Sequence, residues 1–141
     1  MDYDLTRFMK AQQKTYQTAL TEIRSGRKIG HWVWYIFPQL KGLGRSCNSE
    51  YYGIADAGEA TEYIKDPCLG EHLREICRAL LSLDSSSAQE VMGYPDDLKL
   101  RSCMTLFANV AEDNQIFLDV LDQYFDGVQD PATLQMLEQN Q

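Results

Sequence analysis

Apolar residues return every three or four positions over most of the chain, the spacing that places them on one face of a helix. The pattern begins after Asp4, a favourable N-cap residue, and stops at Gly26, a residue that commonly follows a helix end. We therefore predict a first helix whose apolar positions are Leu5, Phe8, Met9, Tyr16, Ala19, Leu20 and Ile23.

From residue 56 onward, capping residues precede each apolar run and divide the chain into further helices. The predicted helices cover 56–65, 66–83, 87–93, 95–107, 114–125 and the stretch from 130 onward. With the first helix, this makes about seven. The expected fold class is all-α, a compact bundle in which residues 1–141 form a single domain.

Residues 31–39 leave two alternatives open. The aromatic and β-branched side chains favour a strand, but no partner strand is evident. A short buried helix that ends before Pro38 fits equally well. The bundle therefore contains either a short helix or one short extended segment near 32–37, followed by a glycine-rich loop over 41–46.

Composition fits a soluble protein with one domain, because 141 residues with 44% hydrophobic and 24% charged content suit a single core. The longest apolar run has six residues, too few to span a bilayer. Four cysteines show no C-x-x-C pair, so we expect reduced thiols in a cytoplasmic protein. Cys68 and Cys77 lie in a helical pattern, which favours buried, unreactive thiols over nucleophiles.

The net charge of −8 is divided unevenly. Residues 1–47 hold eight basic and three acidic residues, whereas residues 48–141 hold five basic and eighteen acidic ones. The acidic remainder disfavours binding to duplex nucleic acid or to an anionic membrane. It leaves room for a compact anionic ligand near the basic part.

The segment from Arg27 to Ser46 holds the first set of candidate ligand-binding residues. Aromatic rings offer flat faces to a base or ribose, and glycines let backbone amides approach a phosphate. Alternatively, the aromatic residues belong to the core and the glycines only turn the chain. The candidates are Lys28, Trp32, Trp34, Gln39, Gly42, Gly44, Arg45 and Ser46.

A second candidate segment, 93–107, adds Lys99 and Ser102 as anchors for a phosphate or carboxylate. Its alternative is an ion pair of Asp96 with Lys99 and a hydroxyl bonded to its own helix. If catalysis occurs, His31 is the natural acid or base, with Asp96 to orient or activate a nucleophile. With two histidines and no metal-binding motif, we expect neither a metal nor a cofactor.

These segments also carry a resemblance to a known family. The strings His31-Trp-Val-Trp34, Ile36-Phe-Pro-Gln-Leu40, Gly42-Leu-Gly-Arg-Ser46 and Thr105-Leu-Phe107 resemble the bacterial family called domain of unknown function 1810, some members of which are labelled calpastatin. The resemblance implies a compact, mainly helical fold and supplies no function. One departure is Cys103, where the family usually has serine.

The function that the residues favour is the binding, with or without processing, of a small anionic nucleotide-type ligand, similar to ADP-ribose, in a pocket built from the two segments. The alternative is a non-enzymatic protein-interaction module that uses the acidic C-terminal helices to meet a basic partner. Both an enzyme and a binding protein fit these residues. Nucleic-acid binding through the basic N-terminal third ranks last.

Overall fold

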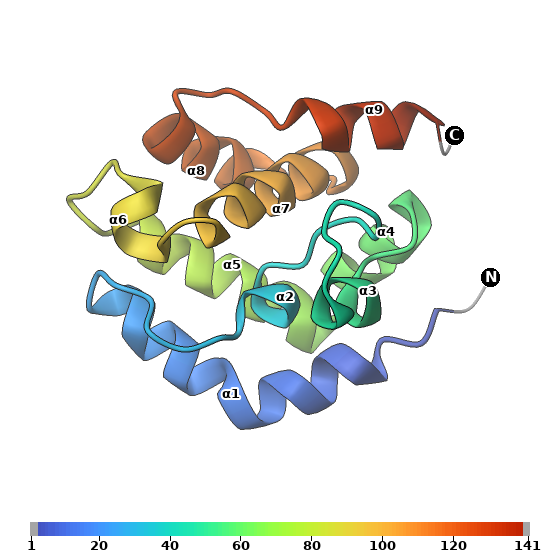
Figure 1. Cartoon of the computed structure of the whole chain (residues 1–141), viewed down its shortest axis with the longest axis horizontal. Helices are drawn as coiled ribbons and strands as arrows, with labels where there is room; N and C mark the ends of the chain where they lie inside the picture. Colours follow the sequence, from blue (N-terminus) through green and yellow to red (C-terminus); the bar gives the residue numbers. More distant parts are fainter. Residues whose placement is uncertain (1–2, 140–141) are drawn as a thin grey trace.

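Residues 3–139 are described by a computed structural model, and within them the chain forms nine helices (Figure 1). The helices are α1 (Thr6–Arg24), α2 (Val33–Ile36), α3 (Cys47–Tyr52), α4 (Ala57–Lys65), α5 (Pro67–Leu81), α6 (Ala88–Met92), α7 (Asp96–Val110), α8 (Gln115–Phe125) and α9 (Pro131–Gln139). The predicted all-α fold class is confirmed.

Caps read from the sequence start α4 and α6 as predicted. Asp56 accepts a hydrogen bond from the backbone N–H of Glu59 at 2.9 Å, and Ser87 accepts one from Glu90 at 3.1 Å. Gly26 follows α1 with a φ of +93°, a backbone conformation that favours glycine. All seven predicted helices are therefore present.

The start of α1 differs slightly from the prediction. Leu5 occupies the N-cap position, and the Asp4 carboxylate instead accepts from the N–H of Thr6 at 2.9 Å. Met9, predicted to face the core, is 40% exposed.

Two short helices raise the count from about seven to nine. Residues 33–36 form α2, so the extended alternative for this segment is wrong. A strand needs a partner, and within residues 3–139 the only β-type pairing is an isolated bridge between Leu40 and Ile54. No element was predicted for residues 47–52, which form α3; Ser46 caps this helix by accepting from the N–H of Ser49 at 3.1 Å.

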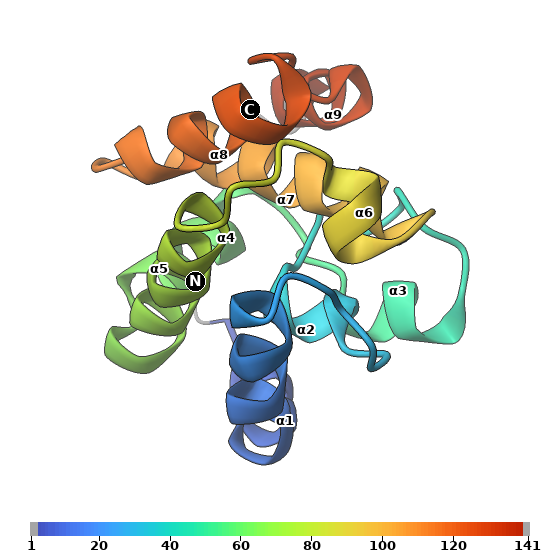
Figure 2. The same ribbon diagram turned by 90° about the vertical axis from the view of Figure 1, so that its left-hand side faces the viewer.

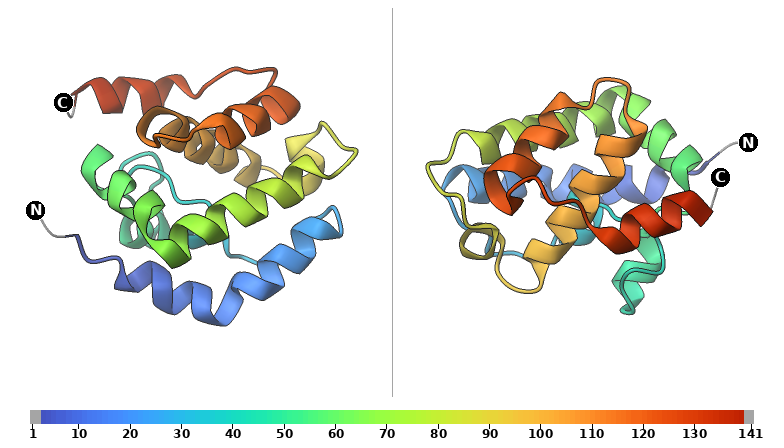
Figure 3. Two further views of the ribbon diagram at one scale, coloured as in Figure 1. Left: turned by 180° about the vertical axis from the view of Figure 1, so that it is seen from behind. Right: turned by 90° about the horizontal axis from the view of Figure 1, so that it is seen from above.

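The helices pack around α7. Seen from the side, α1 lies at one edge of the molecule and α8 and α9 lie at the opposite edge (Figures 1 and 2, and the left panel of Figure 3). Between them, α7 packs against α2, α4, α6, α8 and α9, while α5 joins α1 to α8. Eight residues of α7 are buried, so this helix is surrounded on most of its faces.

The four cysteines are free thiols in two different environments. Cys77 and Cys103 are buried, and burial raises the pKa of both thiols. Cys68 is exposed in the first turn of α5, so the expectation of a buried thiol holds for Cys77 and is wrong for Cys68. No helix within residues 3–139 is long and apolar enough to cross a membrane.

A glycine inside α5 lies in close contact with the end of α4. A Cβ on Gly70 would lie 2.2 Å from the carbonyl oxygen of Ile64. Alanine normally stabilises a helix interior by about 0.5–1 kcal/mol relative to glycine, but overpacking costs about 1–3 kcal/mol. We predict that Gly70→Ala lowers the free energy of unfolding in urea, whereas the exposed substitution Gln17→Ala leaves it nearly unchanged. A more stable G70A variant would contradict this packing.

Candidate functional site

A carboxylate held between two lysines joins the two segments that the sequence singled out. Nζ of Lys28 lies 2.7 Å from Oδ2 of Asp96, and Nζ of Lys99 lies 3.3 Å from Oδ1. The Lys28 side chain is only 5% exposed. Because both Asp96 oxygens contact lysine, this side chain positions the two cations.

The loop that delivers Lys28 is fixed by Glu22 at the end of α1. Oε1 of Glu22 accepts from the backbone N–H groups of Ile29 and Gly30 at 2.7 and 2.9 Å, and from the Trp32 indole at 2.9 Å. Burial opposes ionisation of Glu22, but these three hydrogen bonds outweigh it and lower the pKa of the carboxyl.

Trp32 belongs to the core. It is 1% exposed, and Nζ of Lys28 lies 5.0 Å from the centre of its ring, within the range of a cation–π contact. Trp32 therefore fits the alternative in which the aromatic residues belong to the core, because no ligand can reach its ring without displacing protein.

A pocket of about 320 Å³ lies beside Lys99. We call it the Gln39–Lys99 pocket; its lining residues are Gln39, Leu43, Gly44, Pro95, Leu98, Lys99, Ser102, Asp130 and Ala132. Four of the predicted ligand-binding residues meet here: Gln39 and Gly44 come from the loop after α2, and Lys99 and Ser102 from α7.

Gln39 is the unusual member of this pocket. The residue is 8% exposed, and its backbone carbonyl oxygen accepts from the N–H of Ile54 at 2.9 Å. Its side-chain amide makes no hydrogen bond within residues 3–139, and its polar atoms are not among the fully buried side-chain atoms that lack a partner there, so the amide is open to the pocket. An amide that faces a pocket without a protein partner is therefore available to a ligand or water.

Gly44 allows the loop to close over Gln39. A Cβ on this glycine would lie 2.3 Å from Oγ of Ser49 and 3.3 Å from Nε2 of Gln39. The glycine is thus required for packing, whatever its contact with a ligand. Gly42 has a φ of +104°, which also favours glycine, and it does not line the pocket.

Asp130 completes the pocket, and the sequence identified it only as the start of the last helix. One of its oxygens, Oδ2, accepts from the hydroxyls of Ser102 and Thr133 at 3.0 and 2.6 Å, while Arg101 Nη2 lies 3.8 Å from Oδ1. Nothing in the sequence around Asp130 distinguishes a cap from a pocket residue. Counting Lys28, Lys99 and Arg101 against the two aspartates, the cluster carries one net positive charge.

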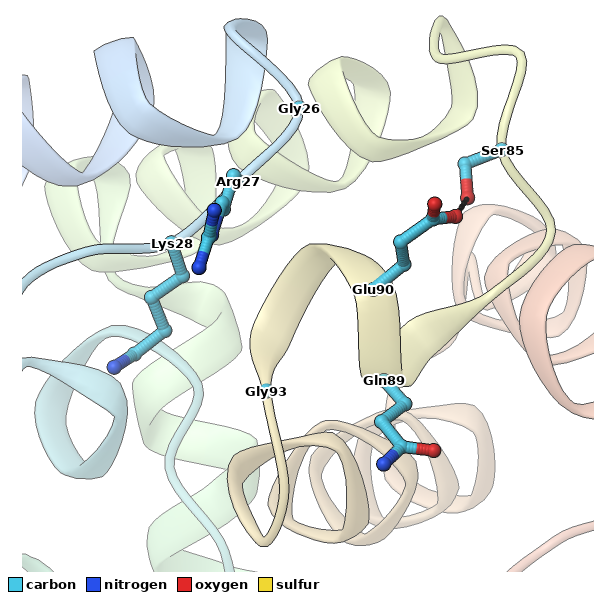
Figure 4. Close-up of a pocket in the computed structure, with 7 residues that line it drawn as sticks. All are labelled: Gly26, Arg27, Lys28, Ser85, Gln89, Glu90 and Gly93. Atoms are coloured by element: carbon cyan, nitrogen blue, oxygen red, sulfur yellow. Dashed lines mark hydrogen bonds between the residues drawn. The ribbon is translucent and has the colours of Figure 1, made fainter.

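A second, larger pocket of about 700 Å³ lies where the loop after α1 faces α6. Figure 4 shows Arg27 and Lys28 on one wall and Ser85, Gln89 and Glu90 on the other. Its remaining lining residues are Gly26 and Gly93. Lys28 therefore lines this pocket while it pairs with Asp96, which in turn holds Lys99 in the first pocket.

Four other predicted residues line neither pocket. His31 and Arg45 are exposed, Trp34 is half-buried against the core, and Ser46 caps α3. Within the described part of the chain, the two candidate catalytic residues, His31 and Asp96, form no hydrogen bond or ion pair with each other; Asp96 pairs with Lys28 and Lys99. Within residues 3–139, no group of three or more His, Cys, Asp or Glu side chains is arranged to hold a metal ion.

The fold and the pockets define a small helical domain with polar pockets around a buried lysine–aspartate–lysine cluster. The chain belongs to the family described as "Protein of unknown function (DUF1810)", whose pattern it matches over residues 2–137. It is similar to the crystal structure of the conserved hypothetical protein Rv1873 from Mycobacterium tuberculosis, at 43% identity and a TM-score of 0.94, covering 96% of this chain and 97% of that one. No curated protein matches the chain.

The lowered pKa of Glu22 predicts acid sensitivity. A carboxyl whose pKa is lower in the folded state contributes stability above its unfolded pKa, near 4.3, and loses it as the pH falls through the folded value. We expect Glu22→Gln to reduce the loss of unfolding free energy between pH 6 and pH 3.5, measured by urea denaturation. This role of Glu22 is contradicted if E22Q and the exposed control Glu138→Gln lose the same amount of unfolding free energy between pH 6 and pH 3.5.

Proposed function

We propose that the Gln39–Lys99 pocket binds a small anionic ligand of the nucleotide type, such as an ADP-ribose-like molecule. The observation that supports this proposal is the amide of Gln39, which makes no hydrogen bond within residues 3–139 and lines the same pocket as the Lys99 ammonium. A ligand phosphate would accept a hydrogen bond from the Lys99 ammonium, and the Gln39 amide would form a further hydrogen bond with the ligand.

The other lining groups suit a sugar phosphate. The Asp130 carboxylate can accept hydrogen bonds from ribose hydroxyls, and Pro95 and Leu98 offer apolar surface to a ring. A volume of about 320 Å³ is at the small end of ligand pockets, which run from about 300 to 1,000 Å³. We therefore expect one phosphorylated ribose unit to fill the pocket and the rest of a dinucleotide to project from it.

The proposal is one of binding, without an assigned reaction. His31 lies outside the pocket, and Asp96 is engaged by two lysines. The free thiols are compatible with our expectation that the protein acts in the cytoplasm.

Calorimetric titration and thermal melting with ADP-ribose, AMP and ribose 5-phosphate test the pocket, with adenosine as the uncharged comparison. We expect the phosphorylated ligands to raise the melting temperature and adenosine to have little effect. Lys99→Ala should weaken binding at least about tenfold, because it removes the cation that contacts the phosphate. Gln39→Glu should weaken it as well, since a carboxylate repels the ligand.

Lys41→Ala is the matched control, because Lys41 is a half-exposed lysine on the loop that carries Gln39 and lies outside the pocket. Arg45→Ala tests whether the exposed arginine of the glycine loop adds to binding. Absence of any stabilisation by the three phosphorylated ligands, or unchanged affinity in K99A, would refute the proposal.

A further inference from the structure

A second cluster of reactive side chains lies between α1 and α5 and shares no residue with the Gln39–Lys99 pocket. It contains Cys68 and His72, one turn apart on α5, and Gln12 from α1. The thiol of Cys68 is exposed, whereas Gln12 is 3% exposed. A weak nucleophile is activated when a base lies beside it and a third group orients that base.

The hydrogen bonds of Gln12 fix which way its amide points. Nε2 donates to the carbonyl oxygen of Tyr35 at 2.7 Å and to the hydroxyl of Tyr63 at 2.9 Å. A carbonyl oxygen can only accept, so the nitrogen must face Tyr35 and the oxygen must face His72.

The orientation of Gln12 determines the tautomer of His72. Nδ1 of His72 lies 2.8 Å from Oε1 of Gln12, an atom that can only accept, so Nδ1 carries the hydrogen. In the neutral ring Nε2 then keeps its lone pair. The Tyr16 ring stacks on the imidazole at 3.7 Å between centroids and 8° between planes, which holds the ring in place.

His72 is suited to accept a proton at neutral pH. Burial lowers its pKa, and the nearby carboxylates of Glu75, Glu71 and Asp66 offset this only in part. From α1, the uncharged Tyr16 and Gln12 side chains face it. The imidazole is therefore mainly unprotonated at pH 7.

The sulfur lies close to the base. Sγ of Cys68 is 3.8 Å from Nε2 and 4.0 Å from Nδ1 of His72. Because these distances are nearly equal, the sulfur is not aligned with Nε2 alone, and a rotation of the Cys68 side chain is needed to direct the S–H at the Nε2 lone pair. Catalytic hydrogen bonds are often this loosely aligned before a reactant binds.

We propose that Cys68 is a thiol-modification site that reacts with small disulfides lacking negative charge, with His72 as its general base and Gln12 as the positioning residue. Nε2 takes the thiol proton as the sulfur attacks one sulfur of the disulfide. The S–S bond breaks, a mixed disulfide forms on Cys68, and the released thiolate takes the proton back from His72. Asp66, Glu71 and Glu75 around the site disfavour anionic disulfides.

The test treats the full chain with cystamine, a dicationic disulfide, and follows the mixed disulfide at each cysteine by peptide mass spectrometry. Cys47 is the internal control, because it is exposed too and has no hydrogen bond to a histidine within residues 3–139. We expect Cys68 to react at least about tenfold faster than Cys47 at pH 7, a threshold set below the roughly 100-fold or more that general-base catalysis typically contributes. Glutathione disulfide, which is anionic, should show a smaller preference for Cys68.

Two variants separate catalysis from structure. His72→Phe keeps a ring to stack on Tyr16 but has no base, so the Cys68 rate should fall to that of Cys47. In the wild type the pKa of His72 lies below 6.5, so the Cys68 rate should rise with pH through that pKa and then level off. At higher pH, direct attack by the Cys68 thiolate should add to the rate. In His72→Phe it should rise steadily with pH.

His72→Gln provides a second variant without a base, should the phenylalanine variant fail to fold; circular dichroism checks both. Equal rates at Cys68 and Cys47 in the wild type, or a Cys68 rate and pH profile unchanged in either folded variant, would overturn the proposal. Because no nucleotide takes part, these results are independent of ligand binding in the Gln39–Lys99 pocket.

Discussion

The region around the two pockets depends on the ion pair between Lys28 and Asp96. Burying an ammonium group is costly unless it is paired and fully hydrogen-bonded. Lys28 meets this requirement with Asp96, the Gly30 carbonyl oxygen and the Trp32 ring. The pair ties the loop after α1 to the first turn of α7, the central helix. The loop lines the larger pocket and α7 lines the Gln39–Lys99 pocket, so the pair connects one wall of each pocket. It also orients Lys99 through the second oxygen of Asp96.

The same pair explains part of the charge asymmetry of the chain. Basic residues of the N-terminal third pair with acidic residues further along the chain at Arg7–Glu59, Lys28–Asp96 and Lys41–Glu50. Part of the positive charge that suggested an anionic ligand is thus used to hold the fold together. The cation that lines the candidate pocket, Lys99, comes from the acidic part of the chain, so the net charge of a segment was a poor guide to the location of a site.

Much of the motif that carries the family resemblance has a packing role. Trp32 is buried beneath Lys28, Gly44 approaches Ser49 too closely for a side chain, and Ser46 caps α3. Gln39 is the exception, because its amide lines the pocket and makes no hydrogen bond within residues 3–139. An amide that has no role in holding the fold is free to contact a ligand. That is a physical reason to place a ligand-binding role on Gln39 rather than on its aromatic neighbours.

The sequence by itself determined seven of the nine helices within residues 3–139, because caps and helical periodicity act within a few residues of each other. It left α2 open between a helix and a strand, because four residues are too few to show a period, and it did not predict α3, although Ser46 caps that helix. It named Gln39, Gly44, Lys99 and Ser102, but only the tertiary structure brings them together and adds Asp130. The spacing of Cys68 and His72 is readable as one helical turn, whereas Gln12 is 60 residues from His72. Contacts over such separations are set by how helices pack, and the local pattern does not encode that packing in a readable form.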